Sequence, residues 1–404
     1  MYEKGRKMEK LSDRKQINRT ILLFACVYMV SYMTRINFGA VITAIVEESG
    51  MTKTMLSAAI TGSSVTYGVG QILSGCVGDR ISPKKLVFLG LTLSSAMNLL
   101  IPVCRDHVQM AAVWCVNGLA QACMWPPLVR LMVGLFTPLD YRRASTVVSW
   151  GSSFGTIAIY LLAPAVITVS GWRVLFLLTA ACGVSMALLW LKYCREPEFQ
   201  KPAPTGRTGE DFSGNLFTPL LAAVMFVIVL QGALRDGVTT WMPSFICETF
   251  GLSSEVSILS GVCLPLFSIL SFRVALALYE RFPGNPVRCA GWIFAAGALS
   301  ALMLTAVCGR SPAASIACMA LLTGCMHGVN MILTCMVPPF FQRHGNISTV
   351  SGILNSCTYV GSAVSTYGIA LLSESAGWQT TAFVWFAIAA AGTAVCMVCG
   401  RIWK

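Results

Sequence analysis

The sequence predicts an all-α integral membrane protein with twelve transmembrane helices in two pseudo-symmetric six-helix bundles. Its composition does not fit a soluble globular protein: 55% of the 404 residues are hydrophobic, only 11% are charged, and the mean hydropathy is +0.70. Soluble domains carry about 25% charged residues. Apolar runs of about 20 residues, the length of a bilayer-spanning helix, recur along the whole chain. Motifs of the first half also return in the second half.

The twelve apolar runs are joined by short polar loops, and each run is long enough for one membrane-spanning helix. One connection is longer: residues 194–215 form a polar linker with Pro and Gly, which separates an N-terminal half, 1–193, from a C-terminal half, 216–404. Pro126-Pro127 and Pro338-Pro339 are expected to bend or end helices. The predicted spans are 19–46, 55–76, 85–104, 109–136, 141–168, 173–193, 216–247, 255–278, 287–308, 313–340, 347–372 and 379–400.

The first span carries an arginine well inside its apolar sequence. Arg35 lies 16 residues after Arg19, which is roughly 24 Å along a helix. An arginine inside a membrane costs about 2.5–3.5 kcal/mol on insertion scales, so Arg35 is expected to face a wet or paired cavity. Two interpretations stay open: an anion-binding site, which we favour, and a structural residue that snorkels or joins an ion pair.

The net charge of +12 is explained by membrane topology and not by nucleic-acid binding. Twenty-one Lys and Arg residues fall in the tails and loops on one side of the predicted spans, and four fall on the other side. The positive-inside rule places the basic side in the cytoplasm. We therefore expect a multi-pass protein of the inner or plasma membrane, embedded in the lipid bilayer, with both termini cytoplasmic.

The sequence offers no catalytic or metal-binding constellation. Its seventeen cysteines lie mostly inside apolar spans, where cysteine behaves as a small hydrophobe. Cys396 and Cys399 have CxxC spacing but lie in an apolar run without a second pair of ligands. No cluster of nucleophile and base is visible either. We expect no enzyme, no cofactor and no metal.

Four features of the first half recur in the same order in the second half. Their offsets are nearly constant, which indicates two homologous six-helix halves. This is the build of alternating-access transporters, whose substrate site lies near the bilayer midplane. The repeated pairs are YMTRINFGAV around Arg35 with ALRDGVTTW around Arg235, GDRISPKK at 78–85 with YERFPGNPVR at 279–288, MWPP at 124–127 with MVPP at 336–339, and SGW at 170–172 with AGW at 376–378.

The loop at residues 75–85, GCVGDRISPKK, resembles the signature loop of the major facilitator superfamily: a Gly, three residues, Asp-Arg and then basic residues. The resemblance covers essentially the whole chain and implies the twelve-helix transporter fold of that superfamily. Asp79 and Arg80 in this loop, and Glu280 and Arg281 in its repeat, are then expected to act in gating. Asp79 can face a helix N-terminus or an arginine.

Three stretches are similar to the organophosphate:phosphate antiporter family, which includes the glycerol-3-phosphate and hexose-phosphate transporters. In that family one arginine of helix 1 and one of helix 7 form the phosphate site, and the matching positions here are Arg35 and Arg235. The guanidinium group suits this role, because it stays charged and grips phosphate or carboxylate oxygens with two parallel hydrogen bonds. The three stretches are TRINF at 34–38, NGLAQACMWPPLVRLM at 117–132 and LRDGVTTWMPSF at 234–245.

Three positions depart from the family pattern. Gln71 stands where relatives carry a Lys, Ser152 stands where they carry a His, and Asp236 stands where they usually carry a Tyr. Neighbouring helical residues point about 100° apart, so Asp236 need not neutralise Arg235 within the site; it could pair with Arg35 or carry a coupling proton. A carboxylate or sugar-acid substrate, as in the anion:cation symporter branch, is the alternative.

Polar residues on the helical faces of the two arginines are further candidates for substrate contact. Residues three or four apart share one face of a helix. The alternative role of each is a hydrogen bond between helices, worth about 0.6 kcal/mol on average. Gly151 and Gly155 form a small face for close helix packing. The candidates are Ser31, Tyr32, Tyr67, Gln71, Ser152, Gln231, Thr239, Asn355 and Tyr359.

The sequence therefore predicts a secondary transporter of a small organic anion, with alternating access and with Arg35 and Arg235 in its substrate site. The favoured substrate is a sugar or glycerol phosphate exchanged for inorganic phosphate. A proton- or cation-coupled symporter of a carboxylate is the first alternative. A non-transporting sensor of sugar phosphate with the same fold is the second. We expect a monomer, with inorganic phosphate or a proton as the coupling ion and no nucleic-acid partner.

Overall fold

The computed structural model describes residues 10–197, 218–252, 263–281, 284–344 and 346–403, and every regular element in these ranges is a helix. The chain divides into two compact units. The first comprises Met1–Thr208 and Pro338–Gly352, and the second comprises Gly209–Val337 and Ile353–Lys404. Most of the predicted linker 194–215 lies outside the described residues.

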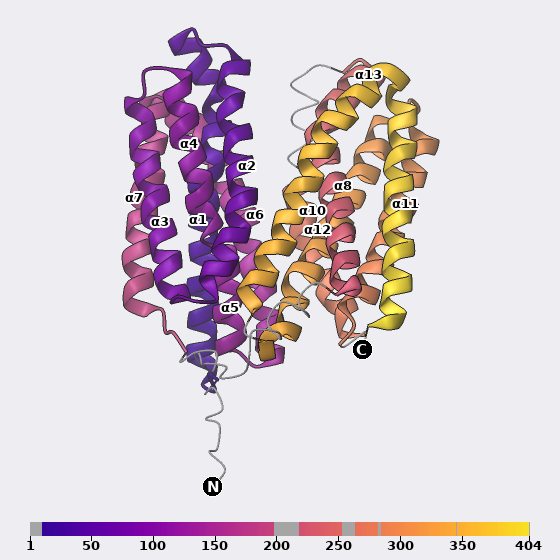
Figure 1. Ribbon diagram of the computed structural model, residues 1–404. Coiled ribbons are helices and arrows are strands. Elements are labelled where there is room, and N and C mark those ends of the chain that lie inside the picture. Colours follow the sequence, from indigo (N-terminus) through magenta and orange to yellow (C-terminus); the bar gives the residue numbers. More distant parts are fainter. Residues whose placement is uncertain (1–9, 198–217, 253–262, 282–283, 345, 404) are drawn as a thin grey trace. The chain divides into compact units, whose positions relative to one another are not determined.

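Five helices of the first unit start at polar caps, and α1 and α6 end at the glycines Gly50 and Gly171. The side chains of Asp13, Thr52, Ser82, Asp106 and Thr137 each accept a backbone N–H bond from the first turn of the helix that follows. These helices are α1 (Arg14–Ser49), α2 (Lys53–Gly78), α3 (Pro83–Leu100) with the 3-10 turn η1 (Ile101–Val103), α4 (His107–Ala122), α5 (Trp125–Leu135), α6 (Pro138–Ser170) and α7 (Trp172–Tyr193) (Figure 1).

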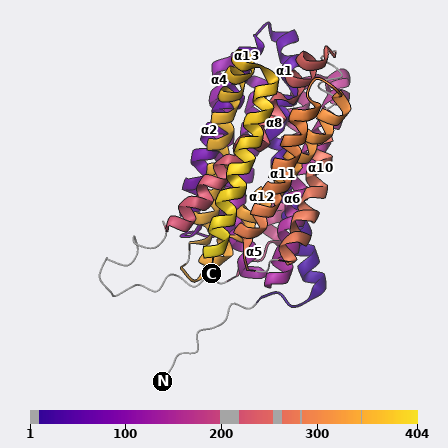
Figure 2. The ribbon, with the colours of Figure 1, turned by 90° about the vertical axis from the view of Figure 1, so that its right-hand side faces the viewer.

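The second unit is also built of helices, and α8, α11 and α12 start at the polar caps Thr218, Asn285 and Ser311. Its last helix contains two predicted spans, because Gly377 adopts a left-handed φ of 76° and breaks the helix there. Helices α11 and α12 pack side by side (Figure 2). The helices are α8 (Pro219–Phe250), α10 (Cys263–Glu280), α11 (Pro286–Val307), α12 (Pro312–Met336) and most of α13 (Ile347–Ile402). The 3-10 turn η2 (Pro338–His344) and the start of α13 belong to the first unit.

Every predicted span coincides with a helical segment in the described residues. Eight helical segments there are long and apolar enough by themselves to cross a membrane. The fourth span consists of α4 and α5, since the helix breaks before Pro126-Pro127, and the tenth consists of α12 and η2, since α12 ends before Pro338-Pro339. Both breaks follow the prediction. Residues 255–262 of the eighth span lie outside the described residues.

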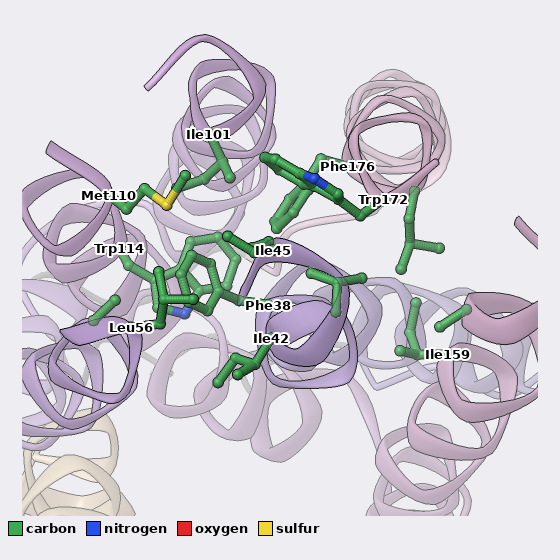
Figure 3. Close-up of a cluster of buried hydrophobic side chains, with 14 of the residues drawn as sticks. Phe38, Ile42, Ile45, Leu56, Ile101, Met110, Trp114, Ile159, Trp172 and Phe176 are labelled. Carbon is green, nitrogen blue, oxygen red and sulfur yellow. The ribbon is translucent and has the colours of Figure 1, made fainter. Parts of the chain in front are cut away.

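A cluster of aromatic side chains fixes α1 against its neighbours in the first unit (Figure 3). The ring of Phe38 lies 5.1 Å from that of Trp114 on α4 and 6.1 Å from that of Phe176 on α7. Trp172 packs edge-on to Phe176, with ring centroids 5.9 Å apart. Aromatic pairs at these spacings add about 0.5–1.5 kcal/mol each beyond the burial of their area. Because Phe38 is fully buried one turn after Arg35, the cluster also holds the arginine in place.

Glycines bring the backbones of two helix pairs close together. A Cβ on Gly155 of α6 would lie 2.5 Å from the carbonyl oxygen of Met29 on α1, and one on Gly151 would lie 2.5 Å from that of Ala25. The predicted small-residue face of α6 is therefore confirmed. In the second unit, a Cβ on Gly361 of α13 would lie 2.0 Å from the carbonyl oxygen of Val229 on α8.

Candidate functional site

The guanidinium group of Arg35 lies against two tyrosine rings of the first unit. Its Cζ atom is 4.0 Å from the ring centroid of Tyr67 on α2 and 5.6 Å from that of Tyr32 on α1. Both distances are within the range of a cation–π interaction. Two residues predicted to line the site, Tyr32 and Tyr67, therefore contact Arg35, the predicted anion-binding residue. Aromatic faces stabilise the charge of the arginine without using its N–H groups, so this contact is compatible with anion binding.

A buried polar network directly behind Arg35 fixes the backbone of α1. The carbonyl oxygen of Thr34 accepts hydrogen bonds from the side-chain amides of Asn98 on α3, at 2.9 Å, and Asn117 on α4, at 3.1 Å. The Gln121 amide donates to the Thr34 hydroxyl at 2.9 Å. All four residues are at most 2% exposed. Paired amides at this depth are costly to disrupt, so the network sets the position from which Arg35 projects.

Sequence reasoning missed this network. Asn117 and Gln121 stand inside the stretch that carried the family resemblance, and their spacing of four residues places them on one helical face. Asn98 stands in the preceding span, and amide side chains such as these three are uncommon in apolar helices. That pattern was the available signal for a polar contact with α1.

In the second unit, Arg235 and Asp236 form a direct ion pair. The Nε atom of Arg235 donates to Oδ1 of Asp236 at 2.6 Å, and its Nη2 atom donates to Oδ2 at 2.8 Å. The sequence left this pairing open, and the structure shows that Asp236 does pair with Arg235. The 100° between neighbouring Cα–Cβ directions does not prevent the contact, because the long arginine side chain reaches back to the carboxylate beside it.

Two further groups face this ion pair from neighbouring helices. The side chain of Ser362 on α13 is hydrogen-bonded to the Asp236 carboxylate. The imidazole of His327 on α12 is close enough to interact electrostatically with both Arg235 and Asp236. The Asp236 side chain keeps 26% of its surface exposed and Arg235 keeps 13%. The pair thus lies among α8, α12 and α13 and keeps part of its surface exposed.

The polar groups of several other candidates form hydrogen bonds to backbone carbonyl groups, either of a neighbouring helix or of their own helix. Gln71 and Gln231 are fully buried; their amides donate to the carbonyl oxygens of Ala122, at 3.4 Å, and Met326, at 3.1 Å. The Ser31, Ser152 and Thr239 hydroxyls donate to backbone carbonyls of their own helices. Asn355 is buried and Tyr359 is half-buried on α13.

The carboxylate of Asp79 accepts two backbone N–H bonds from the start of α13, which belongs to the first unit. The donors are Ser348, at 2.9 Å, and Thr349, at 2.7 Å. Arg130 approaches the same carboxylate, with 3.8 Å between its Nε atom and Oδ1 of Asp79, and donates to the carbonyl oxygens of Gly78 and Ile81. A carboxylate is favoured at a helix N-terminus. Burial nevertheless raises the pKa of Asp79, against the effect of these donors.

The other three predicted gating residues are exposed. Arg80 follows Asp79 in the loop after α2, Glu280 is the last residue of α10, and Arg281 follows it. Among the residues that the structure describes, no group of three His, Cys, Asp or Glu side chains is placed to hold a metal ion, and Cys396 and Cys399 are free thiols.

Comparison with known proteins shows the family to which this sequence is similar. The model of the family described as "Major Facilitator Superfamily" matches residues 24–366. The probable hexose phosphate transport protein of Chlamydia pneumoniae is 24% identical over 277 residues, which cover 60% of this chain and 59% of that protein. The glycerol-3-phosphate transporter of Bacillus subtilis is 24% identical over 304 residues, covering 69% and 68% of the two chains.

Two further comparisons extend this context. The membrane sensor protein UhpC of Salmonella typhimurium is 24% identical over 302 residues, covering 67% of each chain. Among solved structures, the outward conformation of the transporter FucP aligns with a TM-score of 0.78 at 12% identity and covers 96% of this chain and 99% of its own. At that identity the likeness concerns the fold alone.

Proposed function

Because this chain belongs to the major facilitator superfamily, and its relatives include a probable hexose phosphate transport protein and a glycerol-3-phosphate transporter, we propose that it exchanges a small phosphate ester for inorganic phosphate. One observation carries the proposal. Arg35 on α1 in the first unit and Arg235 on α8 in the second unit both lie well inside apolar helices, and the two stand at equivalent positions of the sequence repeat. Both stay charged in a membrane, where such a charge requires an anionic or aromatic partner.

The relatives support phosphate as the recognised group. A hexose phosphate transport protein and a glycerol-3-phosphate transporter are both similar to most of this chain. A phosphate ester and inorganic phosphate share the oxygens that a guanidinium fork binds with two hydrogen bonds. A transporter that recognises this shared group can load either anion, so exchange follows from one binding chemistry.

Exchange in proteoliposomes tests the proposal. Vesicles loaded with inorganic phosphate should take up labelled phosphate, and Arg35→Lys and Arg235→Lys should each abolish the uptake, since an ammonium group cannot bind two oxygens in one plane. Arg173→Lys is the matched control, because Arg173 pairs with Glu48 at the end of α1 and should tolerate the change. Uptake that survives both changes at full rate would refute the assigned role of the arginines.

A second candidate function is proton-coupled symport of a carboxylate or sugar acid. The observation that favours it is the carboxylate of Asp236, which already occupies the fork of Arg235. If the wild type shows no phosphate exchange, labelled gluconate and dicarboxylates under an inward proton gradient are the next substrates. Binding of a sugar phosphate without transport of any anion would instead indicate a sensor, the role that the name of the Salmonella relative states for that protein.

For the cellular setting, we propose the inner or plasma membrane with both termini in the cytoplasm. The support is the distribution of Lys and Arg, with 21 on the side of the termini and four on the opposite side.

A further inference from the structure

The carboxylate of Asp236 meets Arg235 in the geometry that an anionic substrate would use. Two hydrogen bonds, 2.6 Å and 2.8 Å long, join Nε and Nη2 of the guanidinium to the two carboxylate oxygens. This is the fork-to-carboxylate arrangement that gives arginine its specificity for planar anions. The Nε/Nη2 edge of Arg235 is therefore already filled by an anion that the chain itself supplies.

We propose that Asp236 is a built-in competitor for the transported anion: it occupies this edge of Arg235 in the empty protein and leaves when the anion binds. The inference rests on the proposed function for the role of Arg235. It adds a mechanism and a selectivity. An anion must replace an existing ion pair, so a phosphate dianion displaces Asp236 more readily than a monoanionic carboxylate of the same size.

The surroundings of Asp236 define what happens to the displaced carboxylate. It faces Ser362 on α13, which is hydrogen-bonded to it, and His327 on α12, which interacts with both members of the pair. Once Asp236 has separated from Arg235, its carboxylate has no full positive charge beside it. A proton is the smallest ligand that removes such a charge. Release of Asp236 from Arg235 and binding of one proton to Asp236 are thus coupled, and proton uptake balances the negative charge.

Chemical modification of the arginine tests the competitor without any substrate. Phenylglyoxal attacks accessible guanidinium groups, and peptide mass spectrometry reports the rate at each arginine. Asp236→Asn should raise the rate at Arg235 about tenfold relative to Arg35 in the same molecule, which corresponds to an ion pair of 1.4 kcal/mol. Asp236→Glu should restore the slow rate. Equal rates in wild type and Asp236→Asn would overturn the proposal.

The control variant is Glu248→Gln, which removes one negative charge from the C-terminal end of α8, away from Asp236. Glu248 accepts a hydrogen bond from Trp378 there. It should leave the relative rate at Arg235 unchanged, and an equal acceleration would overturn a specific role of Asp236. If Asp236→Asn does not fold, judged by size-exclusion chromatography and circular dichroism, Asp236→Ser gives the same test.

The proton coupling is tested by repeating the modification at several pH values. In the wild type, the rate at Arg235 relative to Arg35 should rise as the pH falls, because a protonated Asp236 releases the guanidinium. In Asp236→Asn the ratio should stay constant. A constant ratio in the wild type would exclude the coupling. These measurements contain no transported anion, so their failure counts against the competitor alone, whereas absence of phosphate exchange counts against the proposed function alone.

Discussion

At the scale of single residues, the two arginines are stabilised by different chemistry. Arg35 rests on the faces of Tyr67 and Tyr32, whereas Arg235 is held by the carboxylate of Asp236. An aromatic face leaves the N–H groups of a guanidinium available, and a carboxylate competes for them. Arg235 is therefore the arginine whose availability to an anion depends on an acidic neighbour.

Substitutions of Tyr67 separate the aromatic contact from its hydroxyl group. Tyr67→Phe keeps the ring and should leave phosphate exchange nearly unchanged, whereas Tyr67→Leu removes the ring and should weaken the apparent phosphate affinity. A cation–π contact of about 1 kcal/mol corresponds to about a fivefold loss. The measurement is the concentration dependence of labelled phosphate uptake. Equal effects of Phe and Leu would show that the ring face does not stabilise Arg35.

At the scale of helices, close backbone packing fixes α13 against α8 in the second unit. Gly361→Ala should lower the stability of the protein by about 1–3 kcal/mol, because the new methyl group would meet the backbone carbonyl of Val229. Gly368→Ala on the same helix is the control: nothing lies within 4 Å of its added Cβ, and alanine favours a helix. Thermal unfolding in detergent measures both. Equal stability of the two variants would contradict the described packing.

A second helix-scale feature joins the end of α1 to the start of α7. The Nε1 atom of Trp172 donates to Glu48 at 2.8 Å, and Arg173 pairs with the same carboxylate. The hydrogen bond from Arg173, with that from Trp172, lowers the pKa of Glu48 below its ordinary value of 4.5. A carboxyl group whose pKa is lowered by folding stabilises the folded protein at every pH above its ordinary pKa. This stabilisation is lost as the pH falls through the lowered pKa.

Glu48→Gln should therefore lower the melting temperature slightly at neutral pH, since the carboxylate is exposed and solvent screens the pair. The difference from wild type should shrink as the pH is reduced below 4.5. Melting curves at a series of pH values measure it. A difference that grows in acid would have the opposite sign and would exclude the Glu48 contacts as its cause.

At the scale of the whole molecule, the two halves repeat both their sequence and their contacts. Glu248 of α8 accepts a hydrogen bond from Trp378 at 2.7 Å, as Glu48 of α1 does from Trp172. Both contacts follow from the repeated SGW and AGW motifs. The prediction of a transporter and not an enzyme is confirmed by the family match and by the relatives.

The proposed orientation is a prediction for the whole chain. A fluorescent protein fused after Lys404 should fold and fluoresce in a bacterial host, whereas alkaline phosphatase fused at the same position should be inactive, because its disulfides form outside the cytoplasm. Phosphatase joined within the predicted outer loop near Arg105 should be active. The reverse pattern would contradict the assignment of the 21 basic residues to the cytoplasmic side.

Much of the fold could be predicted because span length and hydropathy are set by the bilayer and not by tertiary detail. The helix breaks near Pro126 and Pro338 were predictable for the same kind of reason, since proline disrupts helices locally. Tyr67 was predicted only as a lining residue of its helix, and its contact with Arg35 depends on how α2 packs against α1.

The polar details of the site depend on geometry that sequence spacing does not determine. The pair of Arg235 and Asp236 could not be predicted because Cβ directions describe only the start of a side chain, and arginine has enough rotatable bonds to return to its neighbour. The amides of Asn98, Asn117 and Gln121 converge on Thr34 from two other helices, and such convergence requires the packing of three helices to be known.

The most direct test of the account is heteroexchange in proteoliposomes that contain the purified protein and labelled inorganic phosphate. External glycerol 3-phosphate or a hexose phosphate should release the internal label, gluconate should not, and neither ester should act on vesicles carrying Arg35→Lys. Release by gluconate but by neither phosphate ester would contradict organophosphate exchange and would assign the two arginines to a carboxylate.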